Sequence, residues 1–309
     1  MKTKIAAIVG PTASGKTSLS IELAKSLNGE IISCDSMQIY KHMNIGTAKP
    51  TWDEMSGIPH RLIDFVEPDL DFSCADYSVL AKKCIDEISE KGKLPIFCGG
   101  TGLYVDHVLN NTVFSDAGKD DSYREKLKML LAEKGEEYIH GLLSEVDPDS
   151  ASKIHPNNSV RVIRALEIYH VTGKTKTEWD LESRSNDSPY DSRMICLDYR
   201  DRQVLYDRID KRVDIMLEMG LVDEVKQLVS KYNLSKTALQ GIGYKEIIDY
   251  LNGSCSFDEA VESIKKGTRN YAKRQLTWFR RYREAAVIYM DEFEKFDDIV
   301  NLAKNIIND

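Results

Sequence analysis

Short apolar runs alternate with longer helical segments over the first hundred residues. The runs of strand length lie at residues 5–9, 30–35, 60–66 and 94–98, and the segments with helical spacing lie at 16–27 and 75–91. Strands that alternate with helices predict a parallel sheet covered on both faces. Ligands of such sheets bind beyond the carboxyl ends of the strands. We therefore expect the loops that follow these strands to share one crevice.

The pattern changes near residue 110. Residues 115–191 are polar and helical in period, with apolar spacing at 122–134, 136–145 and 160–171. Strand-like runs return at 194–198 and 286–290, separated by helical segments at 202–219, 222–232 and 257–283 and followed by a closing helix. This order predicts an α/β core made of residues 1–114 and 192–309, interrupted by an all-helical domain at 115–191.

Composition limits the class of protein further. Of the 309 residues, 42% are apolar and 30% are charged, and no stretch approaches the roughly 20 apolar residues of a membrane span. No cleavable signal precedes the first apolar run, so we expect a cytoplasmic protein without membrane contact. Six scattered cysteines form no metal-ligand pattern and predict buried thiols. No apolar seam stands out, so we expect a monomer.

Charge is segregated near the end of the chain. Residues 265–283 include eight basic side chains and no acidic one, whereas residues 284–309 include seven acidic side chains and two lysines. Aromatic residues interleave with the basic ones, including Tyr271, Trp278 and Phe279. This combination is typical of an RNA-binding surface. On residue type alone it equally fits a solvated basic helix with its aromatic side chains in the core.

The stretch GPTASGKT at residues 10–17 matches the phosphate-binding pattern G-x-x-x-x-G-K-[ST] between a strand and a helix. Glycines let the backbone wrap around an anion, and the loop amides and the helix N-terminus face that anion. Lys16 adds a positive charge, and the hydroxyl of Thr17 can ligate Mg²⁺. The residues predicted to bind the phosphates are Gly10, Thr12, Ala13, Ser14, Gly15, Lys16 and Thr17.

The loop specifies a polyphosphate and not a nucleotide. Nucleoside-triphosphate chemistry also requires an acid at a strand end to hold Mg²⁺. Asp64 and Asp198 follow apolar runs and could serve, but either could equally be an ordinary strand-end residue. The guanine-reading pattern N-K-x-D is absent. Binding of ATP at this loop stays open at this point.

Longer motifs resemble those of one enzyme family, the tRNA dimethylallyltransferases. The resemblance rests on seven pieces that occur in order: GPTASGKT (10–17), ISCDSMQIYK to NIGTAKP (32–50), IPHRLID (58–64), GGTGLY (99–104), RVIRALE (161–167), QGIGYKE (240–246) and AKRQLTWFR (272–280). These pieces cover nearly the whole chain. The resemblance implies a P-loop-kinase-like parallel sheet with an inserted helical domain.

The resemblance also implies a reaction. The family transfers a dimethylallyl group from dimethylallyl diphosphate to the N6 amine of adenine 37, beside the anticodon of tRNAs that read codons beginning with U. By resemblance the phosphate loop and Mg²⁺ would hold the diphosphate, Asp35 would be the general base, and Thr101 would bond the bridging oxygen. Arg212 would clamp the diphosphate.

The same comparison implies a tRNA-binding surface. The acceptor base would be flipped into the crevice, and the anticodon stem-loop would lie across the basic helix and the insertion. The residues implied to contact tRNA are Asp35, Ser36, Met37, Gln38, Arg161, Arg164, Gln240, Gly243, Lys273, Arg274, Gln275 and Arg280. Trp278 and Phe279 are expected in the core.

Other interpretations remain for several residues. Asp35 could ligate Mg²⁺ or a hydroxyl, Thr101 could belong to a turn that positions a helix, and Arg212 could pair with Asp207 or Asp210 at the surface. A small-molecule kinase would explain the phosphate loop and Asp35 but not the basic aromatic helix. A non-catalytic RNA-binding module would not explain why the chemical residues are all present in one expected crevice.

Overall fold

The chain divides into two compact units in the computed structural model, which describes residues 2–110, 120–184 and 187–309. The larger unit combines residues 1–109 with 189–309, and the smaller unit spans residues 110–188. The expected boundary between residues 114 and 115 lies outside the described residues. The second segment of the larger unit begins at residue 189 in the structure, three residues before the expected start at 192.

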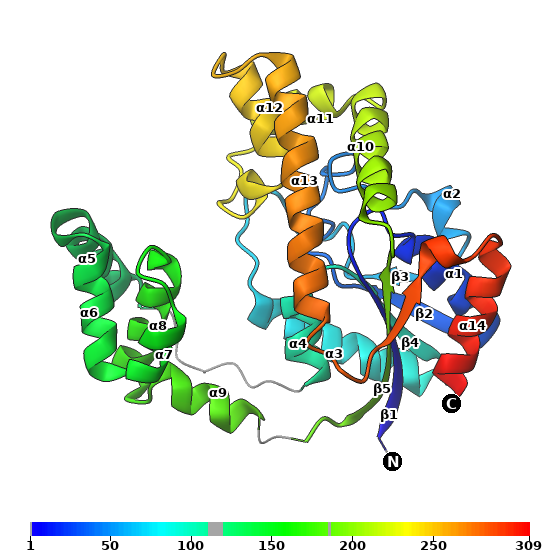
Figure 1. Ribbon diagram of the computed structural model, residues 1–309, viewed down its shortest axis with the longest axis horizontal. Coiled ribbons are helices and arrows are strands. Elements are labelled where there is room, and N and C mark those ends of the chain that lie inside the picture. The colour runs from blue at the N-terminus through cyan, green and yellow to red at the C-terminus, as the bar shows by residue number, and fades with distance from the viewer. Residues whose placement is uncertain (1, 111–119, 185–186) are drawn as a thin grey trace. The chain divides into compact units, whose positions relative to one another are not determined.

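One parallel sheet forms the centre of the larger unit (Figure 1). Among the described residues its strands are β1 (Thr3–Val9), β2 (Gly29–Ser33), β3 (His60–Arg61), β4 (Leu94–Gly99), β5 (Tyr190–Asp198) and β6 (Ala286–Tyr289). Their spatial order is β3-β2-β4-β1-β5-β6, and each neighbouring pair is parallel. The predicted fold class, an α/β protein with a parallel sheet, is confirmed.

Side chains alternate between the two faces of this sheet. On β1, Ile5, Ala7 and Val9 pack into one apolar cluster, whereas Ala6 and Ile8 pack into the other. The first cluster is covered by α3 (Cys74–Glu90) and α4 (Gly102–Leu109), and the second by α1 (Lys16–Leu27) and α14 (Phe296–Asn308) (Figure 1). Because helices cover both faces, strand residues of either parity are apolar.

The strand expected at residues 60–66 is much shorter. Only His60 and Arg61 pair with β2. Leu62 and Asp64 then take positive φ angles of 58°, a left-handed conformation that breaks the extended backbone. Val66 rejoins the structure through a single parallel bridge to Tyr40. The apolar side chains of this segment pack in a loop and not in a ladder, which the hydrophobic pattern does not distinguish.

A helical layer follows β5 in the same unit. It comprises α10 (Arg202–Glu218), α11 (Leu221–Lys231), η1 (Ala238–Gln240), α12 (Tyr244–Leu251) and α13 (Phe257–Phe279), while α2 (Trp52–Met55) and η2 (Met290–Glu292) are short. The predicted α13 was four residues too long, because Arg280 is its C-cap. No helix in the described part of the chain is both long and apolar enough to cross a membrane.

The smaller unit is helical throughout its described residues. Its elements are α5 (Asp121–Lys134), α6 (Glu136–Val146), α7 (Pro148–Lys153), α8 (Ser159–Thr172) and α9 (Lys176–Arg184). They enclose an apolar cluster built around Leu127, Leu143 and Val162. The helices α7 and α9 were not predicted. Asp147 caps α7 through the amide of Ser150, and its carboxylate also accepts hydrogen bonds from Thr177.

Candidate active site

The phosphate-binding loop lies where β1 ends and α1 begins. Gly10 has a φ of 140°, and a Cβ there would lie 2.6 Å from the carbonyl oxygen of Leu197 on β5, so only glycine fits. Gly15 is also left-handed and precedes the first turn of α1. The Oγ of Ser14 is buried and has no hydrogen-bond partner among the described residues. A loop with an unpartnered buried hydroxyl and a free helix N-terminus is suited to an anion.

The charged form of Lys16 is destabilised in this loop. Its Nζ donates a hydrogen bond to the carbonyl oxygen of Pro11 at 2.5 Å. Burial lowers the pKa of Lys16, and the nearby Arg212 lowers that pKa further, whereas Asp35 opposes the change. The charged form of a buried lysine beside a second cation is stabilised strongly when an anionic ligand binds next to it.

Asp35 and Thr101 lie at the ends of neighbouring strands β2 and β4. One carboxylate oxygen of Asp35, Oδ1, accepts hydrogen bonds from the amides of Met37 at 2.9 Å and Gln38 at 3.3 Å. No hydrogen bond between described residues uses Oδ2. Thr101 binds the same loop, because its Oγ1 accepts from the amide of Ser36 at 3.0 Å. The two side chains are therefore fixed to one turn.

Arg212, on α10, lies near Lys16 and Asp35. Burial lowers its pKa, and the negative charges of Asp35 and Glu54 oppose that change. Its expected surface partners are engaged elsewhere, since Asp210 pairs with Arg269 and Asp207 accepts a hydrogen bond from Gln203. The structure thus favours the crevice position over the surface ion pair.

Arg208 was not identified from the sequence. It lies one helical turn before Arg212, and its Nε donates to the carbonyl oxygen of Ala13 in the phosphate loop at 3.0 Å. The sequence signal was present, because two arginines four residues apart share one face of a helix. Reading Arg212 alone overlooked the pair.

The chain itself provides few ligands for Mg²⁺. No group of three His, Cys, Asp or Glu side chains among the described residues could hold a metal ion. Thr17 lies at the crevice, with its hydroxyl close enough to Cys98 to affect that thiol. A Mg²⁺ ion commonly keeps several waters and bridges to substrate phosphates, so a single hydroxyl beside a phosphate loop fits it.

The two alternative magnesium acids are both paired with cations. Asp198 is buried and forms two hydrogen bonds with Arg202, one of them between Nη2 and Oδ2 at 3.0 Å. Asp64 lies 2.5 Å from the Nζ of Lys49. Asp198 is thus a paired acid at the end of β5, and Asp64 is a paired acid in the loop that follows β3.

The basic segment at residues 265–283 separates into paired and unpaired side chains. Lys265, Arg269 and Arg281 pair with Asp214, Asp210 and Asp106, respectively. Lys273 and Arg274 are exposed and have no acidic partner among the described residues, and they lie over the rings of Tyr206 and Tyr271. Phe279 is 1% exposed, as expected of a core residue, and Trp278 is partly buried against the same cluster.

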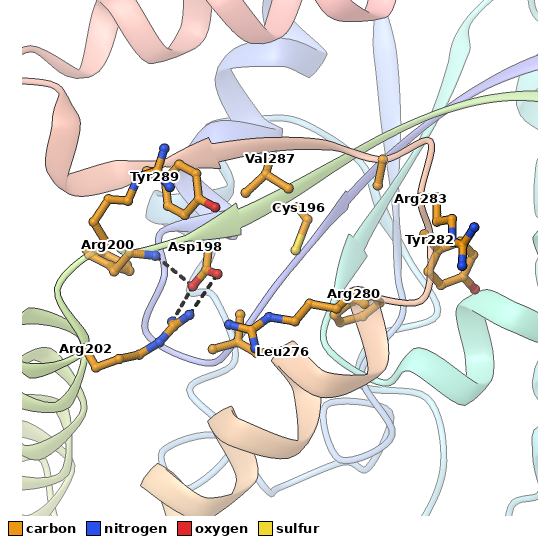
Figure 2. A pocket seen from close by; sticks show the side chains of 13 residues that line it. Cys196, Asp198, Arg200, Arg202, Leu276, Arg280, Tyr282, Arg283, Val287 and Tyr289 are labelled. Atoms are coloured by element: carbon orange, nitrogen blue, oxygen red, sulfur yellow. Dashed lines mark hydrogen bonds and ion pairs between the residues drawn. The ribbon is translucent and has the colours of Figure 1, made fainter.

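Arg280 points into a separate pocket of about 410 Å³ at the ends of β5 and β6 (Figure 2). Asp198 and Arg202 form an ion pair in the lining of this pocket, and Arg200 and Arg283 also line it. Arg280 and Arg283 carry no acidic partner among the described residues. The predicted binding residue Arg280 therefore faces a basic pocket that does not include Lys16, Asp35 or Thr101.

The loop after Asp35 packs against the QGIGYKE segment. The Nε2 of Gln38 donates to the carbonyl oxygens of Thr47 and Ala48, both at 3.2 Å. A Cβ on Gly241 would lie 2.8 Å from the Cε of Met37. Gln240 is exposed, as a binding residue would be. Gly243 differs from expectation, since it is buried and its amide donates to Glu246 at the start of α12.

Gln275 also differs from expectation. Its side chain is 4% exposed, and both ends of its amide have backbone partners in the larger unit. In the smaller unit Arg161 is exposed without a described partner, whereas Arg164 forms a 2.6 Å ion pair with buried Glu167. Of the predicted RNA contacts, those with exposed side chains are Arg161, Gln240, Lys273, Arg274 and Arg280.

Comparison with known proteins decides the family. The IPP transferase family model matches residues 38–282, and the isopentenyl transferase model matches residues 3–69. The chain belongs to the IPP transferase family. The chain is therefore a prenyl-transferring enzyme, as its motifs implied.

Relatives of this IPP transferase are similar over nearly their full length. A tRNA dimethylallyltransferase of Acetivibrio thermocellus is 54% identical over 96% of this chain and 95% of its own. One from Thermoanaerobacter sp. (strain X514) is 50% identical over 99% and 97%, respectively. These values place the whole chain within the family.

Solved IPP transferases have the same fold. The crystal structure of the full-length tRNA isopentenylpyrophosphate transferase of Bacillus halodurans is 47% identical, with a TM-score of 0.75 over 99% of this chain and 96% of that one. A eukaryotic dimethylallyltransferase studied crystallographically while acting on tRNA is 32% identical, with a TM-score of 0.81 over 93% of this chain and 74% of that one. The P-loop-type α/β core of the IPP transferase is therefore shared with both.

Proposed function

We propose that this enzyme transfers the dimethylallyl group of dimethylallyl diphosphate to the N6 amine of adenine 37 in a tRNA anticodon loop, in tRNAs that read codons beginning with U. The donor chemistry rests on the phosphate loop, and the acceptor chemistry rests on the names of close relatives and on the motif resemblance. The reaction breaks the allylic C–O bond and forms a C–N bond, and it releases diphosphate and the N6 proton.

The observation that carries the proposal is that Lys16 lies near Arg212 and Asp35. Two partly buried cations, Lys16 and Arg212, share a crevice with the Oδ2 of Asp35, which no described residue bonds. Cations whose pKa values are lowered by burial are suited to bind a departing diphosphate, because its developing charge gives them a partner in the transition state. Mg²⁺ bound at Thr17 would neutralise further charge on the diphosphate.

Asp35 supplies the base in this proposal. The exocyclic amine of adenine is a poor nucleophile, since its lone pair is delocalised into the ring, and it must lose a proton as the C–N bond forms. The turn holds Oδ1 through two amides and leaves Oδ2 for that proton. Thr101 lies beside the same turn, where its hydroxyl would bond the bridging oxygen of the donor.

RNA binding is assigned to the unpaired basic side chains. Lys273 and Arg274 on α13 provide exposed positive charge, and Arg161 on α8 provides it in the inserted helical domain. Single-stranded loops are recognised by such charges together with stacking of unpaired bases. We therefore assign RNA contacts to Lys273 and Arg274 in the larger unit and, separately, to Arg161 in the smaller unit.

The proposal is tested by incubating the full-length enzyme with a tRNA anticodon stem-loop, Mg²⁺ and dimethylallyl diphosphate. Mass spectrometry of the RNA should show the addition of one five-carbon unit at the adenine 3′ of the anticodon. A reaction with ATP in place of the donor should leave the RNA unchanged. Consumption of ATP without any prenylated RNA would contradict the proposal and favour a kinase.

Asp35→Asn tests the base within the same assay. Asparagine still accepts from the amides of Met37 and Gln38, so the turn is retained while the base is lost. We expect the single-turnover rate constant to fall about 10²- to 10⁴-fold. Asp64→Asn is the matched control, because that acid lies with Lys49, and it should react at the wild-type rate. A wild-type rate in Asp35→Asn would exclude Asp35 as the base.

A further inference from the structure

A single buried amide joins the two loops of the active site. Gln275 is 4% exposed in the middle of the basic part of α13. Its Oε1 accepts a hydrogen bond from the amide of Thr12 in the phosphate loop at 2.9 Å. Its Nε2 donates to the carbonyl oxygen of Gly100 at 3.1 Å. The side chain thus bridges β1 and β4 at their carboxyl ends, immediately before Thr101.

The loops are shaped to admit this side chain. A Cβ at Gly100 would lie 1.9 Å from the Nε2 of Gln275, so a side chain at residue 100 would displace the end of Gln275 from its present position. Residue 100 must therefore be glycine while Gln275 occupies this position. The absence of a side chain at residue 100 thus leaves the space that the side chain of Gln275 fills.

Tyr271, one helical turn before Gln275, extends the same contact. Burial raises the pKa of Tyr271, whose hydroxyl lies close enough to the side chains of Thr101 and Gln275 to affect that pKa. The same helix face therefore reaches the phosphate loop, the Gly100 carbonyl and Thr101. The neighbouring exposed residues of this helix are Lys273 and Arg274.

We propose that Gln275 is a positioning residue that fixes the phosphate loop and the Thr101 turn at one separation and connects both to the RNA-binding helix. It does so without touching RNA. The inference rests on the proposed function, because the separation matters through the distance between the bound diphosphate and Thr101. A misplacement of about 1 Å at such a site costs up to about 100-fold in rate.

Glutamine is suited to this task by its chemistry. Its amide presents one acceptor and one donor on the same carbon, which match the Thr12 amide and the Gly100 carbonyl. Methionine has a similar length but provides no comparable acceptor and no donor. Ionised glutamate keeps the acceptor but places a second lone pair against the Gly100 carbonyl. Protonated glutamate restores the donor.

The test uses full-length Gln275→Met and Gln275→Glu, with Thr277→Ala as the matched control on the same helix. The hydroxyl of Thr277 is exposed and bonds to the carbonyl of Lys273 within the helix. We expect Gln275→Met to lower the single-turnover rate constant at saturating RNA about 10- to 100-fold. Its Kd for the stem-loop should stay within about twofold of wild type, as expected of a residue without an RNA contact.

The pH profile of Gln275→Glu provides an independent readout. Burial should raise the pKa of the introduced carboxyl, so its protonated form becomes populated as the pH falls. The ratio of the variant rate to the wild-type rate should therefore rise on acidification, and taking the ratio cancels the pH effects that both enzymes share. A ratio that does not change with pH would overturn the proposal. This test remains available if Gln275→Met does not fold.

Other outcomes are also decisive. A wild-type rate in Gln275→Met, with or without a weaker Kd for RNA, would overturn the proposal, and a weaker Kd would make Gln275 an RNA contact. A slower rate with an unchanged Kd and an unchanged thermal midpoint would support it. Absence of transfer by both the wild type and Thr277→Ala would instead overturn the proposed function.

Discussion

At the scale of residues, Lys16 and Arg212 are two neighbouring cations whose pKa values are both lowered by burial. Because burial lowers the pKa of Lys16, the folded chain holds this proton less tightly than the unfolded chain. At neutral pH the ionised side chain therefore reduces the stability of the fold, and the reduction disappears only above the pKa of the unfolded state. An anion that binds beside Lys16 offsets this effect, which makes ligand binding strongly stabilising.

Arg212→Ala should separate binding from stability. We expect the affinity for Mg²⁺-diphosphate to fall about 10- to 100-fold, because a charge-assisted contact contributes about 1.5–3 kcal/mol. Without ligand the thermal midpoint should not fall, since a partly buried cation beside Lys16 is removed. Isothermal titration and thermal unfolding with and without diphosphate measure both effects. An unchanged affinity would place Arg212 outside the diphosphate site.

Some residues of the site were predictable from the sequence and others were not. The phosphate loop, Asp35 and Thr101 stand at strand ends within motifs, so their meeting follows from a parallel sheet. Gln275 was assigned to RNA by the resemblance of the AKRQLTWFR segment, and its burial depends on the rotation of α13 against two loops distant in sequence. No local pattern encodes that rotation.

At the scale of elements, the basic side chains of α13 divide into those with acidic partners and those without among the described residues. Lys265 and Arg269 form ion pairs with Asp214 and Asp210 of α10, whereas Lys273 and Arg274 have no acidic partner among the described residues. The basic residues of this segment thus fall into two groups, those with an acidic partner and those without one among the described residues. The sequence shows their density but not which of them have acidic partners across the fold.

Salt dependence should distinguish the two groups. For Lys273→Ala we expect weaker binding of the stem-loop. The plot of the logarithm of the binding constant against the logarithm of the salt concentration should also be less steep by about 0.7, because one phosphate contact to a single strand is lost. Arg281→Ala serves as the control and should leave the slope unchanged, because Asp106 already neutralises that guanidinium. Equal slopes for Lys273→Ala and the wild type would remove Lys273 from the RNA surface.

The helix α8 depends on a buried acid. Glu167 is 0% exposed and bonds to Arg124, Arg164 and the amide of Asp120. Burial alone would raise the pKa of Glu167, but the hydrogen bonds from both arginines hold that pKa below its ordinary value. The resulting stability is present above the unfolded pKa and is lost as the pH falls through the folded pKa.

Glu167→Gln should therefore loosen the inserted helical domain. We expect a loss of about 2–3 kcal/mol in local stability, somewhat less than for a fully buried pair because both arginines are partly exposed. Amide hydrogen exchange on the full chain should show faster exchange in α5 and α8 at pH 7, and the difference from wild type should shrink at acidic pH. Unchanged exchange would mean that the arginines stabilise α8 without this acid.

At the scale of the whole molecule, one sheet is assembled from both sides of an insertion. The central strand β1 pairs with β4, which precedes the helical unit, and with β5, which follows it. The alternation of strands and helices predicted this interrupted core. The strand order and the two-residue length of β3 were not predictable, because both depend on which edges meet in space and on left-handed residues within an apolar run.

The crystal structure of the enzyme with an unreactive thio analogue of dimethylallyl diphosphate and an anticodon stem-loop would test the central claim most directly. We expect the diphosphate in the loop formed by residues 10–17, beside Lys16 and Arg212. The N6 of the flipped adenine should lie about 2.6–3.2 Å from the Oδ2 of Asp35. A diphosphate bound away from this loop, or an adenine that does not reach Asp35, would contradict the proposed mechanism.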